Sequence, residues 1–547
     1  MKNQSSLFEN LQEDKLSIRS AAVSANVSDA TIRNWIKAGY IEKISSGYVS
    51  ITSLEKFKKN KIGKEKLTAR ANKSSKDAHD HEYASEIIKN KILIGDFNCI
   101  KISDEYEAML SESFRNKEGI YYTPPYLVKN LISEIIGDIS SSEFCDPCCG
   151  TGNFLIEALS RGFKPENIYG YDTDPVAVSI AKKRFFEATG LEAENIKVAD
   201  FLVESIKKEA RKFDYIYTNP PWGKKLPKEE KESYGSILGA RKSLDTCSLF
   251  LLASLRCVKE NGSIGFLLPD SFFNVANFEE IRIRALSLEV SKVIDYGKPF
   301  KGLMTKAVGI FLKNIKSTQK SPEVQCEFNG KNYGRTIDSF LKNPKSIINF
   351  KSTPEDEEVI EHVYKIPHKT LYKNAEWGLG IVTGNNAKFC RSTESEGYIP
   401  VYRGSDIKKS GISEPTCFIP DDMSLYQQVA PLEIYRAEKK LIYKFITSEL
   451  CFFYDENQRY VLNSANILIP SDNLNITGDQ LCKLLNSNFI NWLYSSLFMT
   501  NKVLRGDLEQ LPIHTEFFKH HEEFEEGAYL DFISIERKSD GAYRVKR

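Results

Sequence analysis

Residues 214–222 (DYIYTNPPW) restrict the fold more than any other stretch of the chain. Tyr and Ile favour a strand, whereas Pro220 and Pro221 have no N–H for a sheet ladder and hold φ near −65°. The chain must therefore leave a strand rigidly at Asn219. In an open α/β sheet ligands bind at this carboxyl edge, so an amide, a prolyl carbonyl and the indole of Trp222 would face one small planar ligand. An ordinary turn after a strand is the competing interpretation.

A glycine turn lies upstream, in residues 144–155 (FCDPCCGTGNFL), between an expected strand and an expected helix. Gly150 and Gly152 let the backbone approach a ligand closely. The third glycine of the dinucleotide fingerprint is missing, and the sequence has no Gly-x4-Gly-Lys-Ser/Thr phosphate loop. Dinucleotide and nucleoside triphosphate binding are therefore disfavoured.

Two further strands end on acidic residues. Residues 168–172 (IYGYD) end on Asp172, about twenty residues past Gly152, where a carboxylate meets ribose hydroxyls; Asp174 is a nearby alternative. Residues 198–202 (VADFL) place Asp200 beside Phe201, with a helix cap as the alternative role for Asp200. With residues 214–222, these motifs predict four strands of one sheet.

Residues 119–128 (GIYYTPPYLV) predict a helix that begins with proline in its first turn and has Thr123 as its N-cap. Helix N-termini carry unpaired N–H groups and a partial positive charge. This one would suit a carboxylate ligand.

Composition limits the class of protein. The 547 residues exceed one ordinary core, and 41% hydrophobic with 27% charged residues is the balance of a globular protein. No membrane-spanning run or hydrophobic leader is visible, so we expect a cytoplasmic protein with reduced cysteines. Cys145, Cys148 and Cys149 have no histidine nearby, and we expect no metal site. The net charge is only +1, but residues 55–76 are rich in Lys and Arg, as in a phosphate-binding segment or a solvated linker.

The N-terminal region predicts a small DNA-binding module. Residues 17–42 fit two short helices joined by a turn with Ser28 as helix cap, and residues 47–51 fit a strand. The pattern resembles winged helix-turn-helix domains of the excisionase and mercury-regulator type. A helical protein-interaction module is the alternative. The residues on the expected DNA face are Thr31, Arg33, Asn34 and Lys37, with Asp29 beside them.

The motifs together resemble the gamma-class DNA adenine-N6 methyltransferases, which use S-adenosylmethionine. The resemblance runs from Gly119 to Leu312 and resumes at the C-terminus. Its order is Thr-Pro-Pro, Asp-Pro-x-Cys-Gly-x-Gly, an acid after the second strand, Asp-Phe after the third, and Asn-Pro-Pro-aromatic after the fourth. It implies an α/β, Rossmann-like catalytic domain.

The resemblance also implies roles for individual residues. The methionine end of the cofactor would meet the Thr-Pro-Pro and glycine segments, the ribose Asp172, and the adenine Asp200 and Phe201. The complete set of implied cofactor residues is Tyr121, Tyr122, Thr123, Asp146, Gly150, Asp172, Asp200 and Phe201. S-adenosylmethionine is the only cofactor implied.

The implied catalytic segment is Asn219, Pro220, Pro221 and Trp222. The exocyclic amine of adenine is a poor nucleophile, and Asn219 Oδ1 with the Pro220 carbonyl could each accept one of its hydrogens. The base must leave the duplex and stack on aromatic rings. Trp222 would supply one face and Phe300 the other, with an ordinary core role as the alternative for Phe300.

The C-terminal part is similar to the target-recognition domains of the same family, which read duplex DNA. Residues 381–383 predict a strand, and residues 481–498 an aromatic helix. Arg403 and Lys502 are candidate DNA contacts, with a solvated surface as the alternative. The expected division is a winged helix-turn-helix (1–58), a basic linker (59–90), the catalytic domain (91–315), an irregular connection (316–368) and an α+β target-recognition domain (369–547).

A monomer acting on double-stranded DNA in a restriction-modification system is therefore expected, and the resemblance allows a separate cognate restriction endonuclease as a partner. Cytosine-N4 methylation is the nearest alternative, although serine usually replaces asparagine there. Glutamine methyltransferases of release factors and some RNA enzymes share the Asn-Pro-Pro-aromatic segment. A non-catalytic DNA-binding regulator is a further alternative, but it would leave the cofactor motifs unexplained.

Overall fold

The computed structural model describes residues 15–25, 29–37, 41–45, 47–61, 81–95, 98, 101–300, 303–316 and 322–547. The chain divides into two compact units. The first comprises Met1–Tyr234, Asp245–Val258 and Phe300–Leu303, and the second comprises Gly235–Leu244, Lys259–Pro299 and Met304–Arg547. Within the described ranges, no helix combines the length and apolar character that crossing a bilayer requires.

Four parallel strands form the centre of the first unit, in the order β7-β4-β5-β6. Their bounds are β4 Phe144–Asp146, β5 Ile168–Asp172, β6 Ile196–Val198 and β7 Phe213–Thr218. Phe144 pairs with both Ile168 and Tyr215, which fixes the register of the three inner strands. The predicted parallel sheet is confirmed, and its four motifs end at one carboxyl edge.

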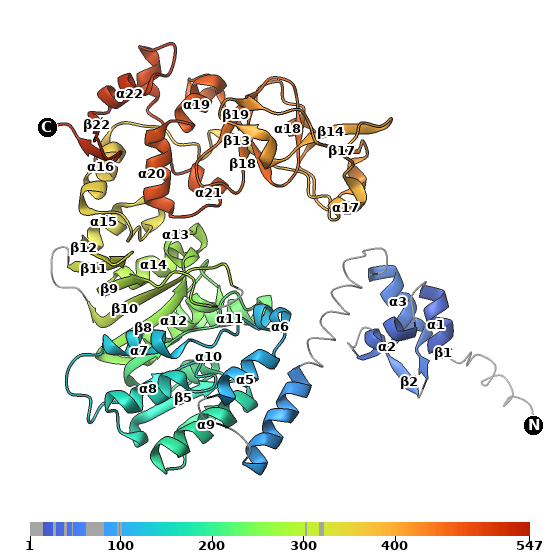
Figure 1. Ribbon diagram of the computed structural model, residues 1–547, viewed down its shortest axis with the longest axis vertical. Helices are drawn as coiled ribbons and strands as arrows, with labels where there is room; N and C mark the ends of the chain where they lie inside the picture. Colours follow the sequence, from blue (N-terminus) through green and yellow to red (C-terminus); the bar gives the residue numbers. More distant parts are fainter. Residues whose placement is uncertain are drawn as a thin grey trace, which may run out of the picture. The chain divides into compact units, whose positions relative to one another are not determined.

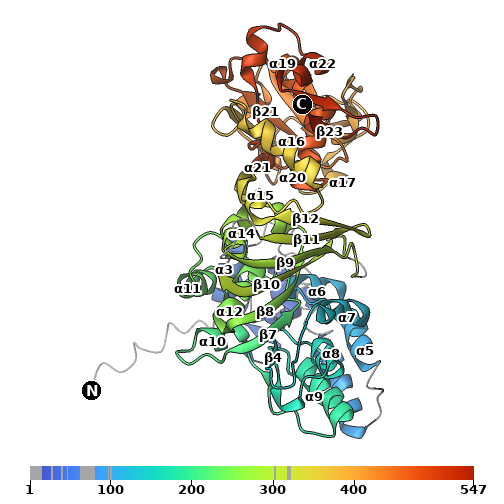
Figure 2. The ribbon, with the colours of Figure 1, turned by 90° about the vertical axis from the view of Figure 1, so that its left-hand side faces the viewer.

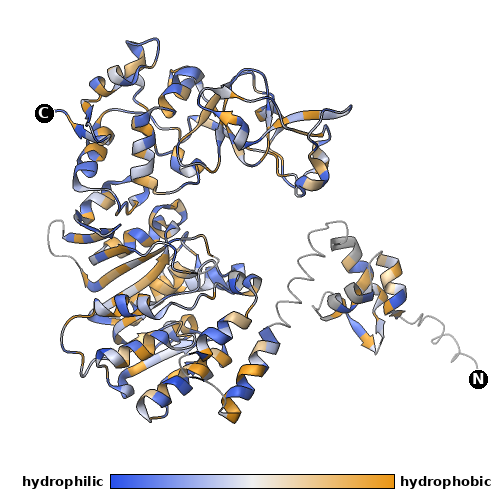
Figure 3. Cartoon of the chain, in the orientation of Figure 1, coloured by the Kyte–Doolittle hydropathy of each residue, from blue (hydrophilic) through white to orange (hydrophobic). Residues whose placement is uncertain are grey.

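Helices cover both faces of this sheet. One face carries α7 Pro125–Ser133, α8 Asn153–Arg161 and α9 Pro175–Thr189, and the other carries α10 Phe201–Ile206 and α12 Thr246–Cys257. Figure 1 labels these elements, and Figure 2 shows β4 and β7 between the two helical layers. Hydrophobic residues fill the strands, and the helices carry hydrophobic and hydrophilic residues on different faces (Figure 3). The sheet is therefore buried on both sides, as parallel sheets require.

An additional helical layer packs on α9. It consists of a helix at residues 81–94, α5 Ile102–Met109 and α6 Glu112–Glu118. Ile88, Ile102 and Tyr106 from this layer are fully or almost fully buried in one cluster with Val176 and Ile180 of α9. The layer brings residues from before Gly119 to the sheet edge that carries the motifs.

The predicted helix after Gly119 is α7, but Thr123 is not its N-cap. Pro124 occupies that position and makes no side-chain capping bond, while Pro125 is the first helical residue. The second proline moves the helix start by one residue. The φ angle of proline suits the first turn, and an N–H at that position would have no partner within the helix, so proline loses no hydrogen bond there. Thr123 is buried instead, and its carbonyl accepts from Asn153 Nδ2 at 2.9 Å.

The second unit contains five neighbouring strands in the order β12-β11-β9-β10-β8. The bounds are β8 Val258–Pro269, β9 Leu288–Asp295, β10 Ala307–Lys316, β11 Glu323–Phe328 and β12 Lys331–Thr336. β11 runs parallel to β9, whereas the β8–β10, β9–β10 and β11–β12 pairs are antiparallel. Two helices, α13 Ser271–Asn274 and α14 Glu279–Leu286, lie between β8 and β9 in sequence.

The prediction of an irregular connection at residues 316–368 is wrong. Beside β11 and β12, this segment contains α15 Ile337–Lys342 and α16 Pro354–Lys365. Arg335 holds it together: its side chain is 1% exposed, donates to the carbonyls of Asn349 and Ser352, and pairs with Glu357 of α16 at 2.9 Å. The abundance of charge predicted solvent exposure, but one of these charges is buried with its partners.

The rest of the second unit has mixed α and β structure. A four-stranded sheet has the order β13-β21-β18-β19, and a three-stranded sheet has the order β17-β14-β20. The bounds are β13 Ala375–Leu379, β14 Tyr398–Tyr402, β17 Cys417–Pro420, β18 Lys440–Lys444, β19 Phe452–Asp455, β20 Tyr460–Val461, β21 Ala465–Pro470, α19 Gly478–Leu485, α20 Asn488–Phe498 and α22 Glu526–Phe532. The helices pack on the larger sheet in a core that includes Leu441, Leu468, Leu484 and Leu493.

Two predicted elements in this part differ from the structure. The strand at residues 381–383 is reduced to isolated bridges at Ile381 and Val382, because β13 ends at Leu379. The single helix at residues 481–498 is two helices, α19 and α20. Ser487 separates them, since its hydroxyl accepts from Ile490 N and caps α20.

The N-terminal segment contains α1 Ile18–Ala25 and α2 Asp29–Lys37, a three-stranded sheet in the order β1-β3-β2, and α3 Ile51–Lys61. The strands are β1 Leu16–Ser17, β2 Lys43–Ser45 and β3 Tyr48–Val49. Ile32 and Trp35 of α2 are fully buried in its small core. The predicted turn with Ser28 lies outside the described residues, and α3 extends past residue 59, where the linker was expected to begin.

Candidate active site

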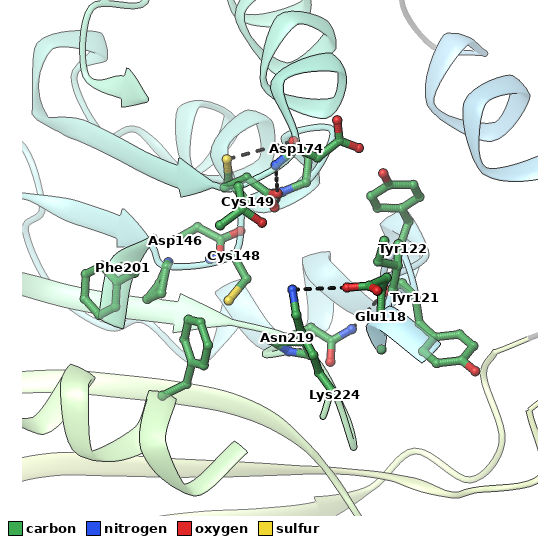
Figure 4. Close-up of a pocket in the computed structure, with 18 of the residues that line it drawn as sticks. Glu118, Tyr121, Tyr122, Asp146, Cys148, Cys149, Asp174, Phe201, Asn219 and Lys224 are labelled. Atoms are coloured by element: carbon green, nitrogen blue, oxygen red, sulfur yellow. Dashed lines mark hydrogen bonds and ion pairs between the residues drawn. The ribbon is translucent and has the colours of Figure 1, made fainter. Parts of the chain in front are cut away.

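A pocket of about 300 Å³ opens at the carboxyl ends of β4, β5, β6 and β7. It is built from the four strand-end motifs and the Thr-Pro-Pro segment (Figure 4). The sequence-predicted residues that line it are Tyr121, Tyr122, Thr123, Asp146, Gly150, Asp172, Asp200, Phe201, Asn219 and Pro221. Pro220, Trp222 and Phe300 are not among its lining residues.

Asn219 lies directly after β7 and is fixed by one hydrogen bond. Its Nδ2 donates to the carbonyl of Tyr121 at 2.9 Å. A carbonyl can only accept, so the amide must turn its oxygen the other way. Asn219 Oδ1 is buried, and no described residue donates to it. Because an unpaired buried acceptor costs free energy, this atom suits an N–H donor supplied by a ligand.

Gly119 brings the Thr-Pro-Pro segment against the Asn-Pro-Pro-Trp segment. It ends α6 in the left-handed region at φ 69°. A Cβ built on Gly119 would lie 2.8 Å from both the N and the O of Trp222. Only glycine therefore allows the two segments to approach this closely.

The rings of Tyr121, Trp222 and Phe300 lie close together. The ring of Tyr121 lies 6.5 Å from Trp222 and 5.7 Å from Phe300, and the rings of Trp222 and Phe300 are 5.2 Å apart and perpendicular. A base stacked between two parallel rings needs about 7 Å, twice the contact distance of carbon atoms. Trp222 and Phe300 therefore contact each other here, and a base would replace that contact. Tyr121, which was predicted on the cofactor side, lines the pocket, and its ring also lies near the other two.

Asp146, at the end of β4, is 1% exposed. Its Oδ1 accepts from Thr218 Oγ1 at 2.6 Å and from Cys148 N at 3.0 Å, while no described donor contacts its buried Oδ2. Burial raises the pKa of Asp146 to about 7. A cationic or N–H-bearing ligand would stabilise the ionised carboxylate.

Gly150 follows in the left-handed region, at φ 49°. A Cβ at this position would lie 2.7 Å from the ring of Tyr122. Its N–H donates to Asp172 Oδ2 at 2.8 Å. The glycine turn therefore orients a carboxylate and contacts an aromatic ring at the same time.

Asp172 and Asp174 have different surroundings. Asp172 Oδ1 accepts from Asp174 N at 2.9 Å, and burial raises the pKa of Asp172 to about 6. Asp174 caps α9 by accepting from Val176 N at 2.8 Å, and its other oxygen accepts from Tyr106 at 2.7 Å. Burial alone would raise the pKa of Asp174, but hydrogen bonds from His81 and Tyr106 lower it. Both oxygens of Asp174 are engaged by side chain and helix, whereas Asp172 is held by backbone N–H groups alone.

Asp200 is both a helix cap and a pocket residue. One oxygen accepts from Leu202 N at 2.8 Å, as the capping interpretation requires, and the carboxylate still lines the pocket. Phe201 is buried beside it, with its ring 5.5 Å from that of Tyr171. Capping therefore orients the carboxylate without occupying both of its oxygens.

Several pocket residues were missed by sequence reasoning. Lys224 pairs with Glu118 at 3.3 Å, and His81 contributes from the helix at residues 81–94. Two signals were present: Glu118 directly precedes the Gly119 motif, and Lys224 lies two residues past Trp222. His81 had no such signal, because its helix lies far upstream.

None of the candidate DNA contacts is among the described residues that line this pocket. Arg33 is exposed on α2, while the side chains of Thr31, Asn34 and Lys37 lie outside the described residues. In the second unit Lys502 is exposed. Arg403 is half-buried. Burial lowers the pKa of its guanidinium, but the nearby Cys417 and Cys390 thiols raise it, and the pKa is raised overall.

Two family models match parts of the chain. Residues 100–327 match the model described as N-6 DNA Methylase, and residues 399–513 match the TaqI-like C-terminal specificity domain. The type II methyltransferase M.VspI from Vibrio sp. (strain 343) is 49% identical over 409 residues, which cover 75% of this chain and 100% of that protein. The modification methylase CviBIII of Paramecium bursaria Chlorella virus NC1A is 23% identical over 74% of this chain and 97% of its own length.

Among solved structures, the type IIL restriction-modification enzyme MmeI in complex with DNA has a TM-score of 0.51. The match covers 75% of this chain and 69% of that chain at 13% sequence identity. At this identity the likeness concerns the fold. It extends beyond the parallel sheet, since it spans three quarters of the chain.

Proposed function

We propose a division of labour within this site from the premise that the chain belongs to the N-6 DNA methylase family of type II methyltransferases. It is a DNA adenine methyltransferase of a restriction-modification system. It uses S-adenosylmethionine and acts on duplex DNA. What remains to be assigned is the work of each residue. The order of its motifs further supports the gamma class.

The pocket is proposed as the cofactor site. Its lining includes five carboxylates, from Glu118, Asp146, Asp172, Asp174 and Asp200, which suit a ligand with a sulfonium and an ammonium group. Asp172 would accept from the ribose hydroxyls, and Asp200 from the adenine amine with Phe201 against that ring. Asp146, with its unpaired buried oxygen, would lie with Gly150 and Tyr122 near the methionine end. When bound, the cofactor supplies an electrophilic methyl group.

Asn219 is proposed to bind the target amine. The observation that carries this proposal is its buried Oδ1, which has no donor while Nδ2 is held by Tyr121. Accepting one amine hydrogen there, and a second at the Pro220 carbonyl, would draw the nitrogen lone pair out of conjugation. The same contacts would stabilise the positive charge that develops as the methyl group is transferred. No covalent enzyme intermediate is needed.

The aromatic group of Tyr121, Trp222 and Phe300 is proposed to receive the flipped base. Their ring centroids lie 5.2 to 6.5 Å apart. A flipped base would enter by separating Phe300 from Trp222, with Tyr121 as a third wall. This assignment moves the Tyr121 ring from the cofactor to the base, while its carbonyl still positions Asn219.

The remaining parts are assigned more coarsely. We propose that residues 369–547 read the DNA sequence, with Arg403 and Lys502 as contacts, and that the N-terminal module is a winged helix-turn-helix that binds DNA. A monomer in the cytoplasm with a separate cognate endonuclease completes the proposal.

The test combines methyl transfer with cofactor binding. Duplexes of varied sequence are incubated with labelled cofactor, and the modified base is identified by mass spectrometry after nuclease digestion. N6-methyladenine is expected, and N4-methylcytosine in its place would support the alternative.

Two substitutions separate the roles of the residues. Asn219→Ala should abolish transfer with cofactor affinity retained, whereas Asp172→Ala should weaken the cofactor. Equal loss of cofactor affinity in both variants would refute this division of labour.

A further inference from the structure

The charges of the pocket leave one part of the cofactor without an obvious partner. S-adenosylmethionine carries a sulfonium, an α-ammonium and an α-carboxylate. Of the described residues that line the pocket, five are acidic, one is His81 and one is Lys224, with no arginine. The two cationic groups have several carboxylates to choose from. The α-carboxylate needs a cation or free N–H groups.

The helix start is a poorer carboxylate site than its sequence predicted. Pro124 is the N-cap of α7 and Pro125 its first residue, so neither has an N–H to donate. The first N–H of this helix belongs to Tyr126, whose side chain is 66% exposed. Two of the donors that make helix N-termini bind anions are therefore missing.

Lys224 is placed to provide the missing charge. Its carbonyl accepts from Thr246 Oγ1 at 2.7 Å, which anchors its backbone at the start of α12. Its side chain extends past Asn219 to Glu118, with Nζ 3.3 Å from Oε2 (Figure 4). Its charge also reaches Asp172, whose pKa it lowers slightly against the larger effect of burial.

The ion pair between Lys224 and Glu118 breaks easily, so each side chain can bind another partner. The two side chains are 31% and 26% exposed, and pairs this accessible to water contribute little stability. They present opposite charges side by side, as the α-ammonium and α-carboxylate of an amino acid do. An amino acid could therefore insert between them, with each charge finding its complement.

Resting on the proposed cofactor site, we propose that Lys224 and Glu118 bind the methionine end of the cofactor by exchanging partners. Lys224 Nζ donates to the α-carboxylate, and Glu118 accepts from the α-ammonium. Without the cofactor, Lys224 and Glu118 pair with each other at the place where the methionine end would bind. These residues therefore distinguish cofactors with an amino acid end from those without one.

The experiment compares two nucleosides that differ at this end. S-adenosylhomocysteine and 5′-methylthioadenosine both carry an uncharged thioether, but only the first has the amino acid group. Dissociation constants are measured by isothermal titration calorimetry on the full chain. Lys224→Met and Glu118→Gln should each weaken S-adenosylhomocysteine by about tenfold or more, the usual effect of losing a charged hydrogen bond. Both should leave 5′-methylthioadenosine within about twofold.

Lys225→Met is the matched control, because this neighbouring lysine is exposed and does not line the pocket. It should change neither affinity. Equal weakening of both nucleosides by Lys224→Met, or no change in either, would overturn the proposal.

Failure of the proposed site itself has a different signature. Asp172→Ala should weaken both nucleosides, because both contain the ribose. If it weakens neither, the cofactor site is misplaced. If it weakens both while Lys224→Met and Glu118→Gln change nothing, only the partner exchange is wrong.

Discussion

Replacing Gly119 with alanine tests whether the contact between the Thr-Pro-Pro and Asn-Pro-Pro-Trp segments sets the catalytic geometry. The new Cβ would lie 2.8 Å from the N and O of Trp222. Ordinary contact needs about 3.5 Å, so the two segments must separate by roughly 0.7 Å. A displacement of about 1 Å at a reacting centre costs about a hundredfold in rate. We therefore expect kcat to fall by at least about tenfold, with cofactor affinity nearly unchanged.

Gly223→Ala is a closely matched control. Gly223 has φ 68°, against 69° for Gly119, but a Cβ there meets no atom within 4 Å. Both variants carry the cost of a left-handed alanine, about 1 kcal/mol, so any difference between them reports the clash. Single-turnover methylation with saturating cofactor measures the transfer step, and urea denaturation measures stability. Equal rates in the two variants would refute the argument.

Three further outcomes follow from the geometry. Trp222→Leu removes about 1–3 kcal/mol of base stacking, so the target base should leave the duplex less often. The fluorescence of 2-aminopurine at the target position rises when that base leaves the duplex stack, and this rise should be lost in the variant. A full rise would contradict the assignment. Because burial raises the pKa of Asp172 to about 6 and of Asp146 to about 7, the cationic cofactor should release protons on binding. Its affinity should then increase with pH across that window in calorimetry, and a flat profile would count against it. Lys440 and Asp455 form a 2.8 Å pair with no exposed surface, and Asp455 also pairs with Arg459 at 2.6 Å. Lys440→Met should lower the free energy of unfolding by about 1–3 kcal/mol in urea, because it removes one of the two cations that neutralise this buried carboxylate; an unchanged midpoint would contradict this.

The sequence predicts the centre of the first unit well. The strands that lead into Asp146, Asp172 and Asn219 are clear in the sequence, because each is a short run with aromatic residues and a proline follows within three positions. Parallel strands share one carboxyl edge, so placing the motifs together needed only their order. The pocket that they form follows from this rule.

Other parts depend on contacts that a linear pattern does not contain. The ring of Tyr121 lies 5.7 Å from that of Phe300, almost two hundred positions later in the chain. The ordered segment at 316–368 depends on burying Arg335, which composition assigns to the surface. The predicted helix start at Thr123 is wrong for a local reason. Either of two adjacent prolines could stand at the first helical position, and it is the second, Pro125, that does.

A pair of prolines follows each partner of the hydrogen bond between Tyr121 and Asn219 in the sequence: Pro124–Pro125 after Tyr121, and Pro220–Pro221 after Asn219. Each proline has little backbone freedom even in the unfolded chain, so ordering these segments costs less conformational entropy than ordering the same length of ordinary loop. Because these segments are ordered by folding itself, the free energy gained when DNA binds is not consumed in organising them. More of it is left for unstacking the base.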